Sequence, residues 1–535
     1  MSLLTNISDW LRGIGSRGRA IVATMSGEPT GLPWPPENAL PRLRIYTRNA
    51  KLYLGEHEQV FVDSGDFKFD YDDSREYVSV NYLGKLSDLL TNRLFGDAVS
   101  LEAPEDNPGT QAFLEHLQQR NDMERLNIEA AALTSYGGDG LYKVRYDAEE
   151  RRICIDLIDP AIWMPETAPL NKRQIIAHNL GTVLQSTGGL YHLWIERHEM
   201  RDGMSWVTNS LYRLGGEVEK GEGRYDPEKD RVPLDTLDAT AGMADETPTG
   251  IDQLLVVHVP NRTILKNGIW GISDYNDLLP IQGEINNRFT QRAEVQDKFV
   301  DPIVYGPDIR DENLEVTLKK NKYIIMPPEG TAPAGYLTWD AELASVVQAI
   351  QELRAAFAVT AGIDLTTVQP QEGGGPQSGR ALRLSQTQTQ DKVKGKQRVF
   401  RGALSRVYSI ATKLATAPGV ALAWKSTEGA ITALEPEEIQ VQFSDGLPAL
   451  SIEEIEEEAM AIDAGIQAPI PAIMRVYDLT REEAEARWEE IQEAQQANAP
   501  AAGMMPFGNP FELVAPAGGE ELEGPEEETD LGGEV

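Results

Sequence analysis

Apolar residues recur at helical spacing in four stretches of the chain. From Tyr77 to Phe95 and from Phe113 to Leu133 they follow every third or fourth position, which predicts two successive amphipathic helices. The glycine-rich string 137–140 should end the second helix. Two longer apolar stripes predict a helix that begins at Ser273 and runs to Phe299, and another helix from Asp340 to Ile363.

Runs in which apolar and polar residues alternate predict strands. Residues 141–146 and 153–158 should form a hairpin across the polar turn 147–152. Other strands are expected before and after the long helix 273–299, at 174–180, 191–197, 206–214, 254–259, 303–305, 314–318, 323–326 and 439–443. This order predicts an α+β protein in which two long helices flank a small β-rich insertion.

A third long helix and two short ones are predicted in the last third of the chain. A glycine-rich loop leads into a helix over 378–415, whose first half is polar and whose second half must pack. Acidic helices should follow at 451–464 and 480–496, each opened by a capping box, with Pro469 and Pro471 separating them.

The chain of 535 residues is strongly acidic. It carries 49 Lys and Arg against 85 Asp and Glu, a formal net charge of −36. This charge argues against a protein that grips phosphate backbones over its whole surface, because such affinity comes chiefly from Lys and Arg. Residues 431–535 hold 26 acids and three bases, a net −23, whereas residues 380–413 hold nine bases and one acid. The helix over 378–415 is therefore a basic helix within an acidic chain.

The two ends of the chain have little to bury. Residues 500–535 contain nine acids, no base, five prolines and seven glycines, which predicts a disordered acidic tail. The first 40 residues are punctuated by Gly and Pro, which favours an arm over a domain. No stretch reaches the roughly 18 apolar residues of a membrane helix, and the single cysteine, Cys154, cannot form an intrachain disulfide. We therefore expect a soluble, cytosolic product with no membrane association.

Patterns typical of catalytic sites are missing from the sequence. The string 374–381 has the outline of a phosphate-binding loop, but Arg380 and Ala381 stand where a lysine and a Mg²⁺-binding hydroxyl are required. Asp70 and Asp72 could bind a metal ion, although a turn followed by a helix cap explains them better.

The histidines and the cysteine also favour ordinary structural roles. His192 and His198 could share one strand face, and an exposed face explains them better than a metal site. Cys154 lies in an alternating strand, where it is best explained as a small core residue. We therefore expect no catalytic residue, no metal and no cofactor. A structural or conduit role is favoured over an acidic metal-dependent enzyme.

Four features follow one another between residues 271 and 416. The first is Gly271-Ile272-Ser273-Asp274-Tyr275 with the string Gln282 to Arg288, and the second is the proline-rich β insertion. The third is the returning helix that ends at Thr360-Ala361-Gly362-Ile363, and the fourth is Gln377-Ser378-Gly379-Arg380-Ala381-Leu382. In this order they resemble the portal protein family of tailed bacteriophages, the head-to-tail connectors of the capsid.

The resemblance implies a function and a set of partners. Portal subunits form a ring, here expected to have twelve subunits, at one capsid vertex of the virion, after assembly in the host cytoplasm. Double-stranded DNA would be packaged through the ring by the terminase large subunit, retained, and later ejected. Capsid and scaffold proteins and head-completion or tail adaptor proteins would be further partners. Another structural virion protein, of the capsid or baseplate, is the alternative.

The resemblance also implies a division of the chain into named parts. These are an N-terminal arm (1–39), a wing (40–266 and 380–450), a stem of two helices (271–299 and 340–363), a clip (300–339), a tunnel loop (364–379), a helical crown (451–497) and the disordered acidic tail (498–535).

Four groups of residues follow from this division. The tunnel loop would bring one group closest to DNA: Leu365, Thr366, Thr367, Val368 and Gln369. Acids along the stem could line the channel and repel DNA, or equally be ordinary solvated helix faces: Asp274, Asp277, Glu284, Glu342 and Glu352. The clip would contact the motor and the adaptors through Asp308, Arg310, Glu312, Lys319 and Lys320. The basic helix is expected to form salt bridges to acidic neighbours in the ring in preference to DNA contacts, through Arg380, Arg383, Lys392, Lys394, Lys396, Arg398 and Arg401.

Overall fold

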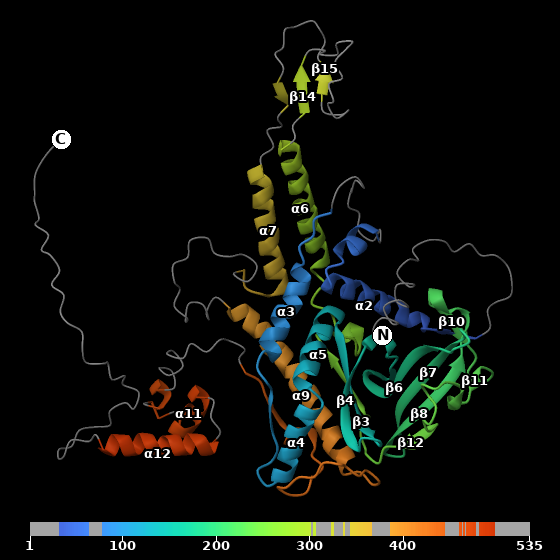
Figure 1. The fold of residues 1–535 in the computed structure, drawn as a ribbon, viewed down its shortest axis with the longest axis vertical. Helices are drawn as coiled ribbons and strands as arrows, with labels where there is room; N and C mark the ends of the chain where they lie inside the picture. The colour runs from blue at the N-terminus through green and yellow to red at the C-terminus, as the bar shows by residue number, and fades with distance from the viewer. Residues whose placement is uncertain are drawn as a thin grey trace, which may run out of the picture. The chain divides into compact units, whose positions relative to one another are not determined.

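The computed structural model describes residues 31–63, 77–300, 303–306, 323–325, 335–337, 343–365, 386–444 and, near the C-terminus, 459–462, 464–465, 467–477 and 481–497. The chain divides into two compact units, residues 1–447 and 448–535, and each is described by itself. The first unit contains both helices and sheets (Figure 1), so that the expected mixture of α and β structure is confirmed.

The helices of the first unit have recognisable ends. The Asn81 side chain accepts a hydrogen bond from the Gly84 N–H at the start of α3, and Gly138, whose φ is +102°, caps the C-terminal end of α5. The helices are α2 (Leu40–Tyr53), α3 (Tyr82–Phe95), α4 (Pro108–Arg120), α5 (Met123–Gly137), α6 (Leu279–Val300), α7 (Leu343–Ala361) and α9 (Thr387–Ala415).

The strands of the first unit form several sheets. The largest has the order β11-β8-β7-β6-β5, with β12 also pairing with β8, and smaller sheets have the orders β13-β3-β4, β1-β10-β9, β15-β14-β16 and β17-β2. The strands are β1 (Leu32–Trp34), β2 (Ser100–Glu102), β3 (Asp139–Asp147), β4 (Arg152–Ile158), β5 (Glu166–Ala168), β6 (Asn171–Gln185), β7 (Tyr191–Arg201), β8 (Met204–Arg213), β9 (Gly215–Glu217), β10 (Glu222–Tyr225), β11 (Arg231–Val232), β12 (Glu246–Pro248), β13 (Val256–Pro260), β14 (Ile303–Gly306), β15 (Tyr323–Ile325), β16 (Gly335–Leu337) and β17 (Gln440–Gln442).

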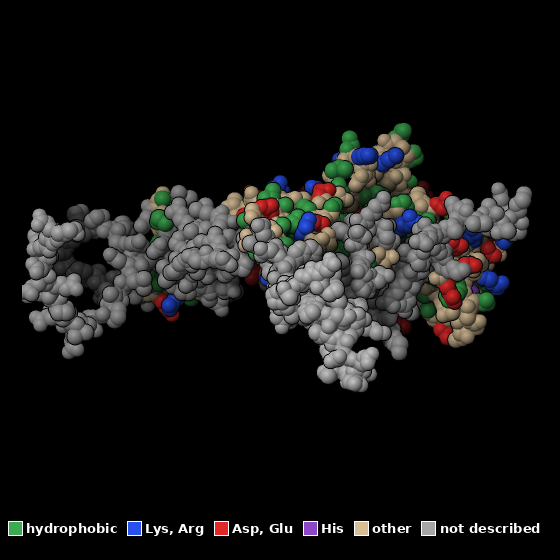
Figure 2. Space-filling view, turned by 90° about the horizontal axis from the view of Figure 1, so that it is seen from above, with side chains coloured by type: hydrophobic (Ala, Val, Ile, Leu, Met, Phe, Trp, Pro, Cys, Tyr) green, Lys and Arg blue, Asp and Glu red, His purple; other side chains and the backbone are tan. Residues whose placement is uncertain are grey.

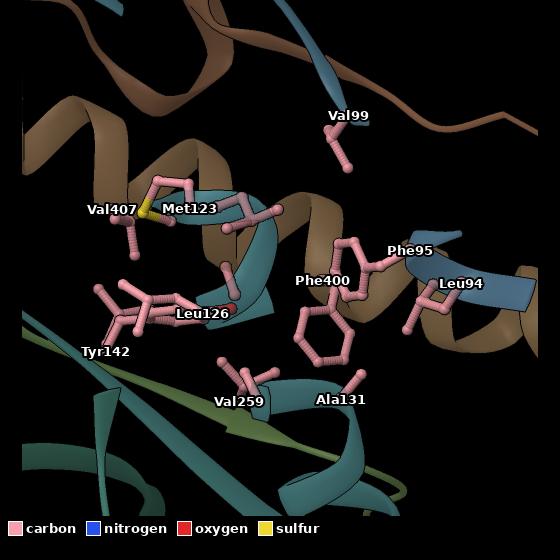
Figure 3. Packing of buried hydrophobic residues seen from close by; sticks show 14 of the residues in the cluster. Leu94, Phe95, Val99, Met123, Leu126, Ala131, Tyr142, Val259, Phe400 and Val407 are labelled. Atoms are coloured by element: carbon pink, nitrogen blue, oxygen red, sulfur yellow. The ribbon is translucent and has the colours of Figure 1, made fainter. Parts of the chain in front are cut away.

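The main hydrophobic core lies between the helices and the β13-β3-β4 sheet. α9 packs on β3 and β13, and its Phe400 ring meets the Phe95 ring of α3 edge-on, with 5.1 Å between the centroids (Figure 3). Tyr142 of β3 is fully buried in the same core and donates its hydroxyl to Asn127 of α5 at 2.8 Å. The middle of α9 is therefore held firmly against the sheet and against α3.

A smaller apolar cluster joins β1 to the largest sheet. Trp34 of β1 packs against Gly181 of β6, where a Cβ atom would lie 2.0 Å from the indole ring. Residues 32–34 were expected in an arm, but they form β1 and pair with β10. Residues 1–30 of the predicted arm lie outside the described residues.

The predicted hairpin is confirmed, because β3 and β4 pair in register from Leu141 opposite Ile158 to Asp147 opposite Arg152. The strands predicted within 174–259 correspond to β6, β7, β8 and β13, and the strand predicted at 439–443 corresponds to β17. The strand predicted at 314–318 lies outside the described residues.

The helix predicted at 113–133 is instead two helices. α4 ends at Arg120 and α5 begins at Met123, because Asp122 takes a left-handed φ of +51°. The Asn121 side chain turns back to donate to the Leu117 carbonyl oxygen at 3.0 Å, and its own oxygen accepts from a backbone N–H of β4. The apolar spacing continues across this break, so the spacing alone does not reveal it.

α6 begins later than its apolar stripe predicts. α6 begins at Leu279 and not at Ser273, since the preceding residues make hydrogen bonds to α5 in place of a helical turn. α7 is described from Leu343 onward and α9 from Thr387 onward. Residues 366–385, which include the predicted start of the basic helix, lie outside the described residues.

In the second unit, α11 (Pro469–Tyr477) and α12 (Arg481–Ala497) pack against each other. The helix predicted at 480–496 is confirmed as α12. Pro469 and Pro471 were expected to separate two helices, but they lie in the first turn of α11, where a backbone N–H has no partner to lose. Of the helix predicted at 451–464, residues 459–462 are described and are helical.

The described surface carries both signs of charge. Seen from above, basic and acidic side chains are interspersed over the parts of the surface that are coloured by type (Figure 2). Among the described residues, no helix is long and apolar enough to cross a membrane.

Candidate functional site: the α6–α7 pair and its junction with α9

Helices α6 and α7 lie side by side and rise from the body of the first unit (Figure 1). Their base is packed on α3 by aromatic rings. Phe357 of α7 is buried, with its ring 5.8 Å from that of Tyr82. The Arg354 guanidinium lies 5.8 Å from the Tyr82 ring and 5.7 Å from the Phe289 ring of α6, which is within reach of a cation–π interaction.

A stripe of buried polar side chains runs along α6 at a spacing of four residues, at Gln282, Asn286 and Thr290. These side chains bond the extended backbone that precedes α3. The Val80 N–H donates to Asn286 Oδ1 at 3.1 Å, and the Val78 N–H donates to Thr290 Oγ1 at 3.0 Å. Gln282 Nε2 donates to the Val80 carbonyl oxygen at 2.7 Å. The stripe therefore fixes the rotation of α6 about its own axis.

Asp274 lies just before α6 and has only 7% of its side chain exposed. Its carboxylate lies 2.7 Å from Lys396 Nζ and 3.1 Å from Lys392 Nζ of α9, and it accepts the Ser135 hydroxyl at 2.8 Å. Burial acts to raise the pKa of Asp274, but the two ammonium groups bring it well below its ordinary range. Asp274 is therefore a buried carboxylate that remains ionised between two lysines.

One of these lysines also reaches the end of α7. Lys392 Nζ donates to the Ala361 carbonyl oxygen at 2.6 Å. The dipole of α7 also favours a cation at this C-terminal end of the helix. Three residues further on, Asp364 Oδ2 accepts the Thr389 N–H at 3.1 Å and the Thr389 hydroxyl at 2.8 Å, in the first turn of α9. We call this group of side chains the junction: Asp274, Asp364, Thr389, Lys392 and Lys396. It joins the segment before α6, the end of α7 and the start of α9.

A second buried carboxylate holds the segment before α6. Asp139 accepts the Gly271 N–H at 2.8 Å and the Tyr46 hydroxyl at 2.5 Å, and it lies 2.7 Å from His258 Nε2. Gly271 approaches Gly138 so closely that a Cβ atom would lie 1.8 Å from the Gly138 carbonyl oxygen. A side chain is therefore excluded at this position.

The acids predicted to line a channel differ in environment. Asp277 and Glu352 are exposed, and Glu284 is half-buried and paired with an arginine one turn away at 2.7 Å. Glu342 lies outside the described residues. Asp274 was expected among the channel-lining acids, but its carboxylate is buried and ion-paired with a lysine of its own chain.

The basic helix also divides into groups. Lys392 and Lys396 were expected to form salt bridges to acidic neighbours in the ring in preference to DNA contacts, and in this chain both pair with Asp274. The other described cations are exposed on α9: Lys394, Arg398 and Arg401. Arg380 and Arg383 lie outside the described residues.

Most residues predicted for the tunnel loop and the clip lie outside the described part of the chain. Leu365 is described and is 44% exposed. The other tunnel-loop residues, the clip residues and the candidate acidic pair lie outside the described residues: Thr366, Thr367, Val368, Gln369, Asp308, Arg310, Glu312, Lys319, Lys320, Asp70 and Asp72.

The prediction that His192 and His198 lie on an exposed strand face is wrong, since both side chains are buried. His198 Nε2 lies 2.8 Å from Glu196, which Lys143 also contacts at 3.0 Å. Burial acts to raise the pKa of Glu196, but His198 and Lys143 lower it to about 2.

Cys154 is buried in β4, as predicted. Among the described residues, no group of three or more His, Cys, Asp and Glu side chains is arranged to hold a metal ion.

Sequence reasoning missed the polar stripe and the junction. The stripe had a detectable signal, because Gln282, Asn286 and Thr290 repeat at the helical spacing of four residues. The junction had none, because Asp274 and Lys396 are 122 positions apart in the chain.

Comparisons with known proteins identify the class to which this fold belongs. The sequence model of the family described as "Phage portal protein, SPP1 Gp6-like" matches residues 38–497. One similar solved structure is described as "Neck of native GTA particle computed with C12 symmetry". It shares 12% identity, with a TM-score of 0.39, over 74% of this chain and 89% of that chain. Comparison with curated proteins gives no match.

The family match covers most of the chain and includes all of the elements that build the junction. The chain belongs to the phage portal protein family, SPP1 Gp6-like. It is a family of structural proteins. The family match confirms the expected resemblance.

Proposed function

We propose that this protein forms a ring of twelve subunits at one capsid vertex, through which double-stranded DNA is packaged by the terminase motor, retained and ejected. The ring would also bind capsid and scaffold proteins, and later the head-completion or tail adaptor proteins. The match of the portal family over residues 38–497 carries this proposal. The role is non-enzymatic, and its place is the virion.

The parts of the chain take the following roles in the proposal. α6 and α7 form the stem, and β14, β15 and β16 belong to a clip at residues 300–339 that faces the motor and then the adaptors. Residues 364–379 form the tunnel loop. Residues 40–266 and 380–450 form the wing, and residues 451–497 form the crown.

The chemistry of α7 supports a conduit. Between Ser345 and Ala361, the helix has two charged residues, Glu352 and Arg354. Arg354 is half-buried against aromatic rings, which leaves Glu352 as the exposed charge of this stretch. A surface without exposed cations makes few fixed phosphate contacts, so a polyanion can slide past it.

The junction supports a role for the loop. The bonds between Asp364 and Thr389 bring together the two chain positions that precede and follow residues 366–385. Lys392 ties the same point to the end of α7. These contacts link the described residues on either side of the loop to the stem and to α9.

Electron microscopy and a deletion test the proposal together. Negatively stained purified protein should show rings with a central hole. Deletion of the seven residues Gln371 to Gln377 should leave the rings intact and reduce packaged or retained DNA. Deletion of seven residues from the predicted tail, Gly518 to Gly524, serves as the matched control and should leave packaging unchanged. A wild-type protein that stays monomeric in all buffers would contradict the ring, and normal packaging by the loop deletion would contradict the tunnel role.

A further inference from the structure

One edge of the largest sheet carries a basic and apolar surface. It consists of residues 169–176, at the turn from β5 into β6, and residues 264–268, which include a short helical turn. The two stretches adjoin, because a Cβ atom on Gly268 would lie 3.3 Å from the Lys172 carbonyl oxygen. We call this surface the basic edge.

The basic edge contains cations, exposed aliphatic side chains and no acid. Its cations are Lys172, Arg173 and Lys266, and none of them forms an ion pair within the described part of the chain. Leu170 is fully exposed and Leu265 is 81% exposed. Large aliphatic side chains that are this exposed, on two adjoining stretches, favour a surface that contacts a partner.

The opposite edge of the same sheet is acidic. β12 pairs with the side of β8 that faces away from β7, while β5 lies at the far end of the strand order. Residues 235–248, which lead into β12 and include it, are mostly exposed and contain four acids and no base. Glu246 is paired with Arg201 at 3.0 Å, and the remaining acids are Asp235, Asp238 and Asp245. We call residues 235–248 the acidic edge.

A second copy of this chain fits the basic edge better than an arbitrary partner. Each copy carries a net charge of −36, so two copies repel each other unless the touching surfaces are locally complementary. A closed ring requires two different surfaces on each subunit, one for each neighbour. The two edges meet both conditions, because they are opposite in charge and lie at opposite ends of one sheet.

We propose that the basic edge of one subunit docks on the acidic edge of the next subunit in the ring. This inference rests on the ring of the proposed function and names the surfaces that close it. Leu170 and Leu265 supply apolar area to the contact, and Lys172, Arg173 and Lys266 pair with the acids of the neighbouring subunit.

Charge reversal and its repair test the contact. The variant Lys172→Glu/Arg173→Glu should lower the fraction of protein in rings at least about tenfold at a fixed concentration, because like charges then face each other. Adding Asp235→Lys and Asp238→Lys to the same chain should restore the rings. The matched control is Arg44→Glu/Lys425→Glu, which makes the same change in net charge at exposed cations outside both edges and should leave the rings unchanged. Native mass spectrometry and sedimentation velocity give the fraction in rings, and circular dichroism confirms that each variant is folded.

The outcomes separate this inference from the proposed function. Normal rings in the Lys172→Glu/Arg173→Glu variant, or no repair by the second pair of substitutions, would overturn the docking of these edges while the ring itself stands. Normal rings that no longer enter capsids would assign the basic edge to a capsid or scaffold protein, which also overturns the inference. If the wild-type protein forms no ring, the proposed function itself fails.

The variant Leu170→Ser tests the contact without changing charge. This side chain is exposed, and its substitution should also lower the fraction of protein in rings.

Discussion

Two carboxylates, Asp139 and Asp274, hold the segment that leads into α6. Both are buried, and each has partners from distant parts of the chain. Asp274 faces two lysines, so its charge is compensated, and removing it would leave Lys396 charged and without its carboxylate in the interior. Buried ion pairs are costly to break in this way, even where a fully apolar replacement would be tolerated.

Replacement of Asp274 should therefore be strongly destabilising. We expect Asp274→Asn to lower the free energy of unfolding by about 3–5 kcal/mol, because Lys392 and Lys396 lose their shared counter-charge. Urea unfolding followed by circular dichroism measures the change. The control is Asp277→Asn, at an exposed acid 3.8 Å from Arg262, which should change stability by less than about 1 kcal/mol. Equal effects of the two substitutions would contradict the role given to Asp274.

Two glycines should respond to alanine in opposite directions. Gly271→Ala places a Cβ atom 1.8 Å from a backbone oxygen, so we expect the variant to be destabilised by several kcal/mol, on the order of 3, or to express poorly. Gly395 lies inside α9 with open space where its Cβ would be, so Gly395→Ala should raise the free energy of unfolding by about 1 kcal/mol. Thermal unfolding of both variants tests the pair, and a tolerated Gly271→Ala would show that the two backbones can separate.

The stability should depend on pH through a buried histidine. Trp163 Nε1 donates to His178 Nδ1 at 3.0 Å, and burial lowers the pKa of His178 to about 3. Below about pH 6.5 the unfolded chain binds a proton at this histidine that the folded chain does not, so stability should fall by up to about 1.4 kcal/mol per pH unit as the pH decreases. Glu196, whose pKa is lowered to about 2, adds a further loss only below about pH 4.5.

Burial also lowers the pKa of His57, His116 and His192, so urea unfolding between pH 7 and pH 4.5 is compared between the wild-type protein and a variant at His178 alone. In His178→Gln, the amide oxygen can still accept the indole N–H, but the side chain does not titrate. This variant should show a shallower decrease of stability over that pH range than the wild-type protein. An unchanged slope would show that His178 is protonated in the folded state.

At the scale of elements, α6 is positioned by its polar stripe as well as by its apolar face. Asn286 is fully buried and contacts Val80, His57, Tyr77 and Gln282. Leaving a buried donor without an acceptor costs more free energy than the hydrogen bond itself contributes to stability. The stripe therefore specifies one orientation of the helix.

Substitution in the stripe should lower the free energy of unfolding more than substitution beside it. We expect Asn286→Ala to lower the free energy of unfolding by about 2–4 kcal/mol, since the Val80 N–H and the His57 ring lose their partner together. The neighbouring Asn287→Ala is the control, because its side chain is half-buried and has one long bond of 3.4 Å, and it should cost less than about 1 kcal/mol. Chemical unfolding measures both. A similar cost for the two residues would mean that the apolar face alone holds α6.

At the scale of the whole molecule, the two units differ in their described hydrophobic clusters and in their net charge. The large hydrophobic clusters of the described residues all lie in the first unit, between residues 34 and 443. The net negative charge, by contrast, is concentrated in the second unit. Residues 448–535 contain 22 acids and three bases, so removing them brings the net charge from −36 to −17.

The first unit should fold without the second. We expect a chain that ends at Leu447 to unfold within about 3 °C of the first unit in the full-length protein, because no cluster of its core is interrupted. Differential scanning calorimetry compares the two proteins. Aggregation or loss of the cooperative transition in the shortened chain would show that the second unit stabilises the first.

The sequence by itself determined the elements whose signal is local. Apolar spacing located α3, alternation located the β3–β4 hairpin, and the charge count located the basic helix. The order of the parts was sufficient for the resemblance to portal proteins, which the family match confirms. The signal for each single element lies within one short window of residues, where helical or strand periodicity can be read directly.

Only the tertiary structure decided where the elements end and what their charged residues do. α6 begins at Leu279 because the preceding residues bond to α5, and Asp274 is a buried counter-ion because two lysines of α9 lie against it. The partners in both cases are more than 100 positions away in the chain. A carboxylate in a polar stretch of sequence has the same local pattern whether it meets water or a distant lysine, so its burial is settled by packing alone.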